Sequence, residues 1–425
     1  MRVLLTGANG FLGRQIMARL LAAGHQVIPA VRCPHQTDAL LPAPASIRVD
    51  FNRDFVTDDW VPRLAGIDAV INCAGVLQAS SRQSIDAIHS GTPKALFRAC
   101  AVAGVRRVIQ ISAISIGANT EYAASKKRAD DFLASSGDAL DWVILRPSLV
   151  YASGAYGGTA LFRALAAMPY FIPVVADGSQ LFQPIHVDDL TDTILRLLDE
   201  PGIKDEIIEP VGPDVLTLRQ MLVDLRRWLG FAPAPVLAVP LWMIRPIAKL
   251  GDMFGGTINT TALQQMLFGN TGDVTRFTAL TGIRPRHWSE ALRARPAQEQ
   301  DRWHARLYFL RPLLRMILAL TWIASGVIGL ASTAAEAQSV ALFGPSLAPV
   351  AAFCACLADI VVGLLVLRRW RVGFTAAAQL VLVTAYTIVL TVAQPGLWLD
   401  PFGPLLKNFV FMLAVVVLAA LETDR

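Results

Sequence analysis

The sequence predicts a doubly wound α/β domain with a parallel sheet and a small cap region, followed by a four-helix transmembrane domain. Two observations carry this prediction. Strand and helix signals alternate over the first 150 residues, which favours a parallel sheet with helices on both faces. Charged residues make up only 17% of the chain, below the quarter that is typical of soluble proteins. The deficit is local, because between Pro312 and Leu367 only Arg315, Glu336 and Asp359 are charged.

The expected strands are short apolar runs that end in glycine, polar or charged residues. Helical patterns separate them, beginning with Phe11–Ala23 and including a long stretch that ends near Ala103. The pattern then loosens, and we expect residues 147–300 to form mainly a cap on the carboxyl edge of the sheet, with Ile207–Ile208 returning to the sheet. The six expected strands are Val3–Leu5, Gln26–Val31, Ser46–Asp50, Asp68–Asn72, Arg107–Ser112 and Asp141–Leu145.

Residues 301–311 are expected to link this first domain, residues 1–300, to a membrane domain formed by residues 312–425. The membrane domain contains four apolar spans of about the length that crosses the core of a bilayer, the last being short. None of them has a polar face at helical spacing, which argues against four buried helices of a soluble bundle. The spans lie near 312–332, 346–367, 372–393 and 404–421.

Arginines mark one side of the predicted membrane domain. Basic residues that flank apolar spans favour the cytoplasmic side, and here they place both ends of the membrane domain on that side. We therefore expect a multi-pass protein of the inner (cytoplasmic) membrane, with its N-terminal domain in the cytoplasm. The arginines are Arg302, Arg306, Arg311 and Arg315 around the start of the first span and Arg368, Arg369 and Arg371 between the second and third.

Asp359 lies well inside the second apolar span, where a charge is costly. We expect this carboxylate to face a partner or a polar cavity, and Arg315 and Lys407 are the candidate partners. The alternatives are a polar residue that packs helices together, or a protonated and hydrogen-bonded carboxyl group. A transport role is the minority interpretation.

The totals argue against several other classes of protein. The net charge of +5 comes without a basic stripe interleaved with aromatic residues, so no nucleic acid partner is expected. The five cysteines have neither metal-site spacing nor the pattern of a disulfide framework, and no metal is expected. The opening run MRVLLTGANG is too short for a cleavable signal and is interpreted as a buried first strand.

A glycine-rich loop follows the first strand and opens the first helix. Its glycines allow a tight turn and a close approach to a pyrophosphate, and the helix N-terminus offers free N–H groups. The alternative is a glycine-rich turn without a ligand, but the strand–loop–helix context favours a dinucleotide site. The candidate cofactor-binding residues here are Gly7, Asn9, Gly10, Phe11, Leu12 and Gly13.

Three further segments are expected at the nucleotide. Arg32 follows the second strand, where an acidic residue would bind a ribose 2′-hydroxyl, and an arginine suits a 2′-phosphate instead. This favours NADP, with NAD as the alternative. Asp50 ends the third strand and is placed to meet the adenine or to cap the next segment. After the fourth strand, Asn72, Ala74 and Gly75 let the backbone approach the phosphates.

These motifs occur in a specific order. The glycine loop is followed by Asn72-Cys-Ala-Gly75, Ser112, Tyr122-Ala-Ala-Ser-Lys126, Leu145-Arg-Pro147 and Pro184-Ile-His-Val-Asp-Asp189. Over roughly residues 1–300 the chain resembles the short-chain dehydrogenase/reductase superfamily, on its extended or atypical, epimerase/dehydratase-like side. That side includes the nucleotide-binding accessory subunit of mitochondrial complex I. The resemblance implies a Rossmann fold and a nicotinamide cofactor. The stretch Leu397–Asn408 resembles the DoxX-like membrane family.

The resemblance implies roles for three residues. Tyr122 would be the acid/base for carbonyl–alcohol interconversion, Lys126 would bind the nicotinamide ribose and lower the pKa of the tyrosine, and Ser112 would hold the substrate oxygen. A neighbouring cation favours phenolate, and a general acid/base works best with its pKa near the working pH. Two features depart from the pattern, because Ser112 and Tyr122 are only ten positions apart and Ser115 competes for the serine role.

Two functions follow from these patterns. The first is a membrane-anchored NAD(P)-dependent oxidoreductase or epimerase-like enzyme, whose substrate is itself held in the membrane, such as a quinone, an isoprenoid or a lipid headgroup precursor. The second is a non-catalytic NADP-binding module that assembles with a membrane protein complex. The expected partners are therefore a nicotinamide dinucleotide, the lipid bilayer, and either a membrane-bound substrate or a membrane complex.

Overall fold

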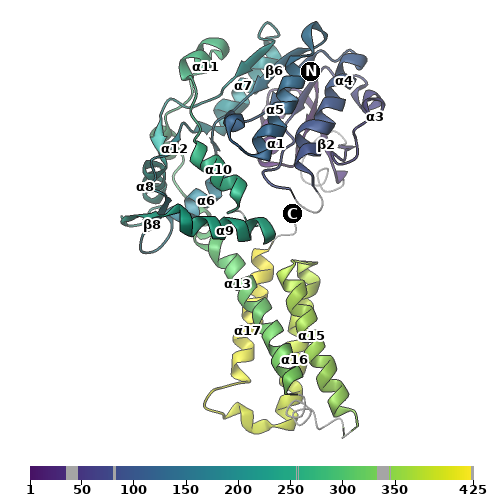
Figure 1. Cartoon of the computed structure of the whole chain (residues 1–425), viewed down its shortest axis with the longest axis vertical. Helices are drawn as coiled ribbons and strands as arrows, with labels where there is room; N and C mark the ends of the chain where they lie inside the picture. The colour runs from purple at the N-terminus through teal and green to yellow at the C-terminus, as the bar shows by residue number, and fades with distance from the viewer. Residues whose placement is uncertain are drawn as a thin grey trace. The chain divides into compact units, whose positions relative to one another are not determined.

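The computed structural model describes residues 1–34, 46–79, 83–254, 256, 258–332, 344 and 346–422. The chain divides into two compact units, Met1–Ala305 and Arg306–Arg425, which are described separately (Figure 1). The residues expected to link the two predicted domains, 301–311, lie within one helix, α13 (Glu299–Ala331).

The first unit is built on a seven-stranded sheet with the order β11-β6-β5-β4-β1-β2-β3, and all its strand pairs are parallel. The predicted α/β fold is thus confirmed, including the returning strand near Ile207. Its strands are β1 (Arg2–Thr6), β2 (Gln26–Val31), β3 (Ile47–Arg48), β4 (Ala69–Asn72), β5 (Arg107–Ile111), β6 (Asp141–Leu145) and β11 (Glu206–Ile208). Every residue of β4 and β5 is buried, as expected for central parallel strands that are covered on both faces.

Helices cover both faces of the sheet. On one face α1 (Phe11–Ala22) and α7 (Val187–Asp199) pack through residues such as Ile16 and Ile194. On the other face α4 (Thr92–Ala103) and α5 (Glu121–Ala134) pack through residues such as Phe97 and Leu133. The shorter elements on this part of the chain are α3 (Thr57–Trp60), η1 (Val61–Leu64), η2 (Ala87–Gly91), η3 (Ile114–Gly117) and η4 (Gly137–Ala139).

The cap has its own apolar core, which includes Phe162, Phe182 and Leu222. Three two-stranded ladders contribute to it: β7 (Val150–Tyr151) with β10 (Ile185–His186), β9 (Leu181–Phe182) with β12 (Leu216–Thr217), and β8 (Ile172–Val175) with β13 (Val236–Val239). Its helices are α6 (Gly157–Ala166), α8 (Leu218–Trp228), α9 (Leu241–Phe254), α10 (Thr260–Phe268) and α12 (Trp288–Ala294), whereas α11 (Val274–Thr281) packs through Phe277 on the core that α1 and α7 share with the sheet.

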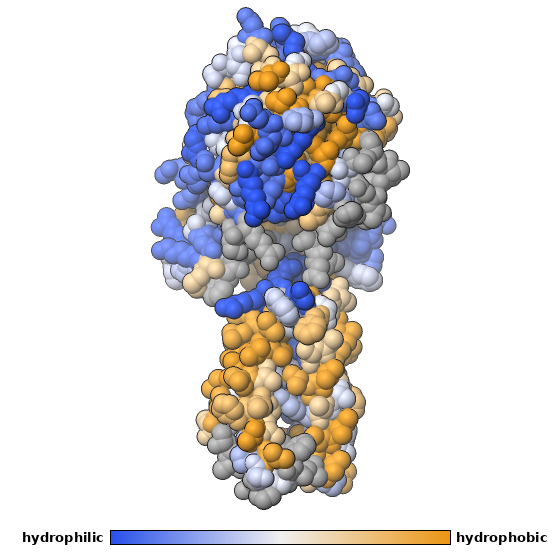
Figure 2. All heavy atoms as spheres, turned by 90° about the vertical axis from the view of Figure 1, so that its right-hand side faces the viewer, coloured by the Kyte–Doolittle hydropathy of each residue, from blue (hydrophilic) through white to orange (hydrophobic). Residues whose placement is uncertain are grey.

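Among the residues that the structure describes in the second unit, three helices are long and apolar enough to cross a membrane, and α17 is a shorter apolar helix. The long ones are α13 (Glu299–Ala331), α15 (Ala348–Leu367) and α16 (Val372–Ala393); η6 (Pro395–Trp398) precedes α17 (Leu406–Leu421). The visible surface of this unit is largely hydrophobic (Figure 2), with exposed side chains such as Leu320, Ile328 and Val381. A hydrophobic exterior is what a bilayer requires.

Helices α13 and α15 approach each other closely at two glycines. A Cβ atom on Gly326 would lie 2.4 Å from the carbonyl oxygen of Cys356, and one on Gly363 would lie 2.8 Å from that of Ala319. Small residues at such contacts are typical of helices that associate within a membrane.

The buried carboxylate of Asp359 has hydroxyl partners. It accepts hydrogen bonds from Ser325 Oγ at 2.9 Å and from Tyr386 OH at 2.7 Å, which ties α15 to α13 and α16. The expectation that Arg315 or Lys407 pairs with Asp359 is wrong. Arg315 lies ten residues before Ser325 on α13, about 15 Å along the helix, and pairs with Glu422, while Lys407 is exposed.

Candidate functional site

The glycine loop between β1 and α1 leaves no room for side chains. Gly7 has φ +65°, and a Cβ atom there would lie 2.7 Å from the carbonyl oxygen of Cys73. A Cβ atom on Gly13 would lie 2.1 Å from the carbonyl oxygen of Gly7. Helix α1 begins after Gly10 without a side-chain cap, so its first N–H groups are available to an anion. The loop therefore fits the pyrophosphate of a dinucleotide.

A buried chain of hydrogen bonds fixes the strand ends beside this loop. Thr6 Oγ1 donates to Asn72 Oδ1 at 2.5 Å, and Asn72 Nδ2 donates to Gln110 Oε1 at 2.7 Å. The backbone N–H of Cys73 donates to Thr6 Oγ1 at 3.2 Å. The side chain of Asn72 is thus engaged within the sheet, and the segment through Ala74 and Gly75 is held against the glycine loop.

Tyr122 and Lys126 lie in the first turns of α5, which Thr120 caps through its side chain. Lys126 Nζ donates to the carbonyl oxygen of Ile111 at 3.1 Å and lies 5.8 Å from the centre of the Tyr122 ring. A Cβ atom on Gly75 would lie 3.6 Å from Lys126 Nζ. The pair therefore lies at the carboxyl ends of the strands, next to the segment that borders the glycine loop.

The electrostatics of this pair differ from the expected direction. Burial raises the pKa of Tyr122 to about 12, and the charge of Asp130 adds to the effect. Burial also lowers the pKa of Lys126, against the opposing influence of Asp130 and Cys73. Removal of the phenol from water therefore raises its pKa even though Lys126 Nζ lies 5.8 Å from the ring centre. At neutral pH the phenol is protonated and can donate a proton.

The two candidate serines have different partners. Ser112 Oγ donates to Asp130 Oδ2 at 2.8 Å, and Arg146 Nε donates to the same oxygen at 2.9 Å. Burial raises the pKa of Asp130, although these two donors oppose the shift. Ser115, in η3, has no hydrogen-bond partner for its hydroxyl within the described ranges. The proton of Ser112 is thus committed to a buried carboxylate, whereas that of Ser115 is uncommitted.

His89 is a residue of the site that the sequence patterns did not indicate. It lies in η2, a single π-helical turn, a feature that is frequent at functional sites. Its Nε2 accepts from the N–H of Val76 at 3.0 Å, and its Nδ1 is 2.9 Å from Ser125 Oγ, which donates to the carbonyl oxygen of Tyr122 at 3.0 Å. The ring also contacts the ring of Tyr122 edge to face. A neutral imidazole protonated on Nδ1 satisfies both contacts.

We expect His89 to make the protein less stable in acid. Burial, with smaller contributions from Lys126 and Arg128, lowers its pKa from 6.5 to about 2. Between these values the unfolded chain binds a proton that the folded chain does not, so stability falls as the pH drops below 6.5. The loss should reach about 2 kcal/mol at pH 5. The fall in melting temperature from pH 7 to pH 5, measured in detergent, should therefore be smaller in His89→Gln.

A matched control for this experiment is His287→Gln. The exposed His287 ring pairs with Asp214, which raises its pKa, so its loss should not reduce the fall in acid. An equal pH dependence in wild type and His89→Gln would contradict the assignment of a buried neutral imidazole.

The remaining predicted cofactor residues lie around the glycine loop and the ends of β2 and β3. Arg32 directly follows β2, and its guanidinium nitrogens are 2.9 and 3.0 Å from the amide oxygen of Gln83, once that amide is turned to face them. Asp50 Oδ1 accepts from the N–H of Asn52 at 3.0 Å, so it stabilises a local turn. Phe11 stacks on Tyr156 with ring centres 5.3 Å apart. Leu12 packs against the apolar core that includes Ile16 and Ile194. Asn9 is exposed.

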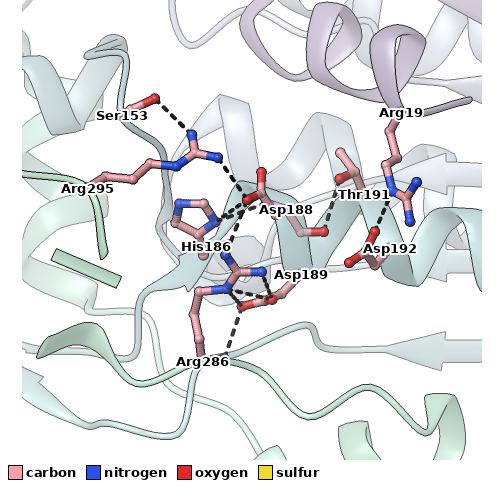
Figure 3. Close-up of polar contacts among 9 residues, drawn as sticks. All are labelled: Arg19, Ser153, His186, Asp188, Asp189, Thr191, Asp192, Arg286 and Arg295. Carbon is pink, nitrogen blue, oxygen red and sulfur yellow. Dashed lines mark hydrogen bonds and ion pairs between the residues drawn. The ribbon is translucent and has the colours of Figure 1, made fainter. Parts of the chain in front are cut away.

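A polar cluster binds the end of the first unit to the start of α7 (Figure 3). His186 accepts from the N–H of Asp188 at 3.2 Å and so caps α7. Arg286 pairs with Asp189 at 2.8 Å and with Asp188 at 3.2 Å, and Arg295 approaches Asp188 at 3.5 Å. The Pro184–Asp189 motif therefore holds the cap to the sheet.

Two families match separate parts of the chain. The NAD(P)H-binding family matches residues 7–168, and the DoxX-like family matches residues 319–416. The first match includes the glycine loop, Tyr122 and Lys126. The second lies within the second unit.

Relatives match part of the chain. An uncharacterized protein of Mycobacterium tuberculosis is 28% identical over 237 residues, which are 56% of this chain and 25% of that protein. The chain thus spans about a quarter of the length of this relative. Ceramide reductase of Caulobacter vibrioides is 25% identical over 264 residues, 61% of this chain and 80% of that protein. The mitochondrial NADH dehydrogenase [ubiquinone] 1 alpha subcomplex subunit 9 of Arabidopsis thaliana is 26% identical, over 55% of this chain and 61% of that protein.

Solved structures share the fold of the first unit. UDP-glucuronic acid 4-epimerase from Bacillus cereus, in complex with UDP-glucuronic acid and NAD, has a TM-score of 0.55 and 19% identity, and the match covers 72% of this chain and all of the epimerase. The family match and the glycine cradle define a nicotinamide-dinucleotide-binding domain, and its fold is similar to that of NAD-dependent epimerases. More specifically, the chain joins an NAD(P)-binding domain of this type, related to epimerases and dehydratases, to a C-terminal DoxX-like membrane domain.

Proposed function

We propose that this protein is a membrane-anchored NAD(P)-dependent oxidoreductase whose substrate is held in the membrane. The observation that carries the proposal is the position of Tyr122 and Lys126 beside Gly75, at the same sheet edge as the glycine loop. The relative named a ceramide reductase supports it, since a ceramide is a membrane lipid. The DoxX-like domain, proposed as residues 312–425, would keep the enzyme at the bilayer.

Each residue of the site has a proposed part in the reaction. Gly7, Gly10 and Gly13 would hold the pyrophosphate, and Lys126 would bind the nicotinamide ribose. When bound, the nicotinamide supplies or accepts a hydride. The protonated phenol of Tyr122 would donate its proton to the substrate oxygen in the direction of reduction. Because the Ser112 proton is committed to Asp130, Ser115 is the better candidate to donate to that oxygen.

Turnover by the purified protein tests this proposal. The full chain, purified in detergent, should oxidise a reduced nicotinamide dinucleotide when lipid extracted from its own membrane is added. The consumed lipid is then identified by comparing the extract before and after the reaction. A protein that binds the dinucleotide but consumes neither it nor any lipid would contradict the enzymatic proposal.

A specific observation favours a second candidate, a non-catalytic nucleotide-binding module of a membrane complex. The pKa of Tyr122 is raised rather than lowered, and Ser112 is occupied by Asp130. A relative that carries the name of a complex I subunit points the same way. Under this function the dinucleotide would stabilise an assembly, and Tyr122 would not be required.

Arg32 is proposed to select NADP over NAD. It directly follows β2, and within the described residues its guanidinium contacts the neutral amide of Gln83, a contact that leaves its charge available to a 2′-phosphate. Arg32→Asp should weaken NADP binding about tenfold or more and leave NAD binding nearly unchanged. Titration calorimetry with both dinucleotides measures the ratio. Arg293→Asp, at an exposed arginine of α12, is the control for a change of surface charge, and an unaltered preference in Arg32→Asp would contradict the assignment.

The proposed orientation places the first unit in the cytoplasm. Arg368, Arg369 and Arg371 join α15 to α16, and their charges favour the cytoplasmic side. A reporter fused after Arg369 should therefore report the cytoplasm, and one fused after Ser332 the opposite side. Activities with the reverse pattern would overturn this topology and, with it, the proposed inner-membrane arrangement.

A further inference from the structure

Helix α9 of the cap presents an apolar face that no element within the described residues of the first unit covers. Its inner side is closed by the fully buried Ala248 and the half-buried Ile244 and Gly251. Five large apolar side chains of the same helix are between 46% and 73% exposed. They are Trp242, Met243, Ile247, Leu250 and Met253.

The exposed residues of α9 fall on two neighbouring sides of the helix, one apolar and one polar. At 3.6 residues per turn, the five apolar side chains form one continuous outer face together with Pro246. Arg245, Lys249 and Asp252 lie together along one edge of that face, and all three are exposed. A helix with a buried side, a polar edge and a bare apolar face that includes tryptophan has the pattern of a helix that lies in a membrane interface.

Helix α10 connects this face to the candidate site. Thr260, at the start of α10, binds Asp252 of α9 through its N–H at 3.0 Å and through its hydroxyl at 2.7 Å. Gln265 Nε2 donates to Thr120 Oγ1 at 2.8 Å, and Thr120 caps the helix that carries Tyr122. Figure 1 shows α9 and α10 next to each other in the cap.

Helices α9 and α10 form a hairpin, and two further contacts place this α9–α10 hairpin at the rim of the site. Asn259 Nδ2 donates to Gln78 Oε1 at 3.0 Å, and Gln78 lies three residues after Gly75. The ring of Phe268, at the end of α10, lies 3.0 Å from where a Cβ atom of Gly117 would be, and Gly117 ends the turn that contains Ser115. Phe268 is itself half exposed, so apolar surface continues along α10 toward the site.

We infer that the outer face of α9 inserts into the headgroup region of the bilayer, and that the α9–α10 hairpin guides a bilayer-held substrate toward Tyr122. The occupant is a lipid surface because the same chain carries helices long and apolar enough to cross a membrane, and because Arg245 and Lys249 suit anionic headgroups. The guiding role rests on the proposed function, whereas insertion of α9 does not.

Quenching by brominated phospholipid tests the insertion in the full-length protein. The protein is reconstituted into phosphatidylglycerol–phosphatidylcholine vesicles with and without bromine on the acyl chains. The fluorescence of Trp242 itself is obtained as the difference between the emission of wild type and that of Trp242→Phe, because the other tryptophans are present in both proteins. That emission should fall about twofold or more in brominated vesicles. Leu250→Asp should abolish most of this fall, whereas Val102→Asp, on the 70% exposed Val102 of α4, should leave it unchanged.

Equal Trp242 emission in brominated and plain vesicles would overturn the insertion. The insertion would also be overturned if a second copy of the chain covered Trp242 in detergent. Cross-linking would then detect a dimer in wild type that is lost in Leu250→Asp.

Turnover separates the guiding role from the proposed function. With a long-chain aliphatic ketone held in vesicles, Leu250→Asp should lower kcat/KM about tenfold. With a short-chain, water-soluble ketone, the same variant should match wild type. Equal losses on both ketones, or none on either, would contradict the guiding role. Quenching without turnover of either ketone or of the extracted membrane lipid would contradict the proposed oxidoreductase and leave the insertion standing.

Discussion

Replacing Tyr122 with phenylalanine should lower kcat about 100-fold or more while changing the affinity for the dinucleotide less than about twofold. The substitution removes the single proton that the half-buried Tyr122 can donate, but keeps the ring that packs against His89. Turnover is followed by the absorbance of the reduced nicotinamide, and affinity by calorimetry. Since burial raises the pKa of Tyr122 to about 12, ionisation of this phenol should not limit the rate of reduction between pH 6 and pH 9.

The matched control is Tyr170→Phe. Tyr170 is 82% exposed, so the loss of its hydroxyl should leave both kcat and affinity as in wild type. If Tyr122→Phe turns over as fast as wild type, or fully restores function to cells that lack the protein, the catalytic assignment fails. The non-catalytic nucleotide-binding module would then be the better function.

Replacing Gly13 with alanine should strongly weaken dinucleotide binding and destabilise the first unit. The new methyl group would lie 2.1 Å from the carbonyl oxygen of Gly7, so α1 must move away from the loop that it supports. Overpacking of this kind costs about 2 kcal/mol or more, and the melting temperature should fall by about 5 °C or more. The N-terminus of α1 would also leave its position, and affinity should drop about 100-fold.

Gly202→Ala controls for the general effect of adding a methyl group. No atom lies within 4 Å of the added Cβ atom there, and neither stability nor affinity should change by a measurable amount. A Gly13→Ala protein that binds the dinucleotide as tightly as wild type would show that the loop does not hold the pyrophosphate.

The sheet was predictable because its strands are short, apolar and separated by helices of regular period. Burial on both faces selects runs such as Val108–Ile109 and Val143–Ile144, and such runs are visible without a structure. The cap was not predictable in detail, because its two-residue strands, such as Leu216–Thr217, carry no periodicity of their own. Their pairing with Leu181–Phe182 depends on contacts made by residues distant in the sequence.

The candidate site, like the fold, has residues that could be predicted from the sequence and residues that could not. The glycines and the spacing of Tyr122 and Lys126 are local features, so they could be recognised from the sequence. Asp130 accepts from Ser112 and Arg146, which follow two different strands. No spacing in the sequence indicates that these three side chains meet. His89 had no local signal, because it is a lone histidine in a helical segment that also holds polar and charged residues. Asp359 was recognised as unusual, but its hydroxyl partners lie on neighbouring helices and could not be named.

The returning strand β11 sets an order of events during synthesis. The sheet is complete only when Glu206–Ile208 pairs with β6, and the first apolar span begins about 100 residues later in the chain. At about 5–20 residues per second, the ribosome needs roughly 5–20 s to make that interval. All seven strands are therefore available to the nascent chain before the first hydrophobic span can engage the insertion machinery. The nucleotide-binding sheet thus has time to assemble while the growing chain is still free of the membrane.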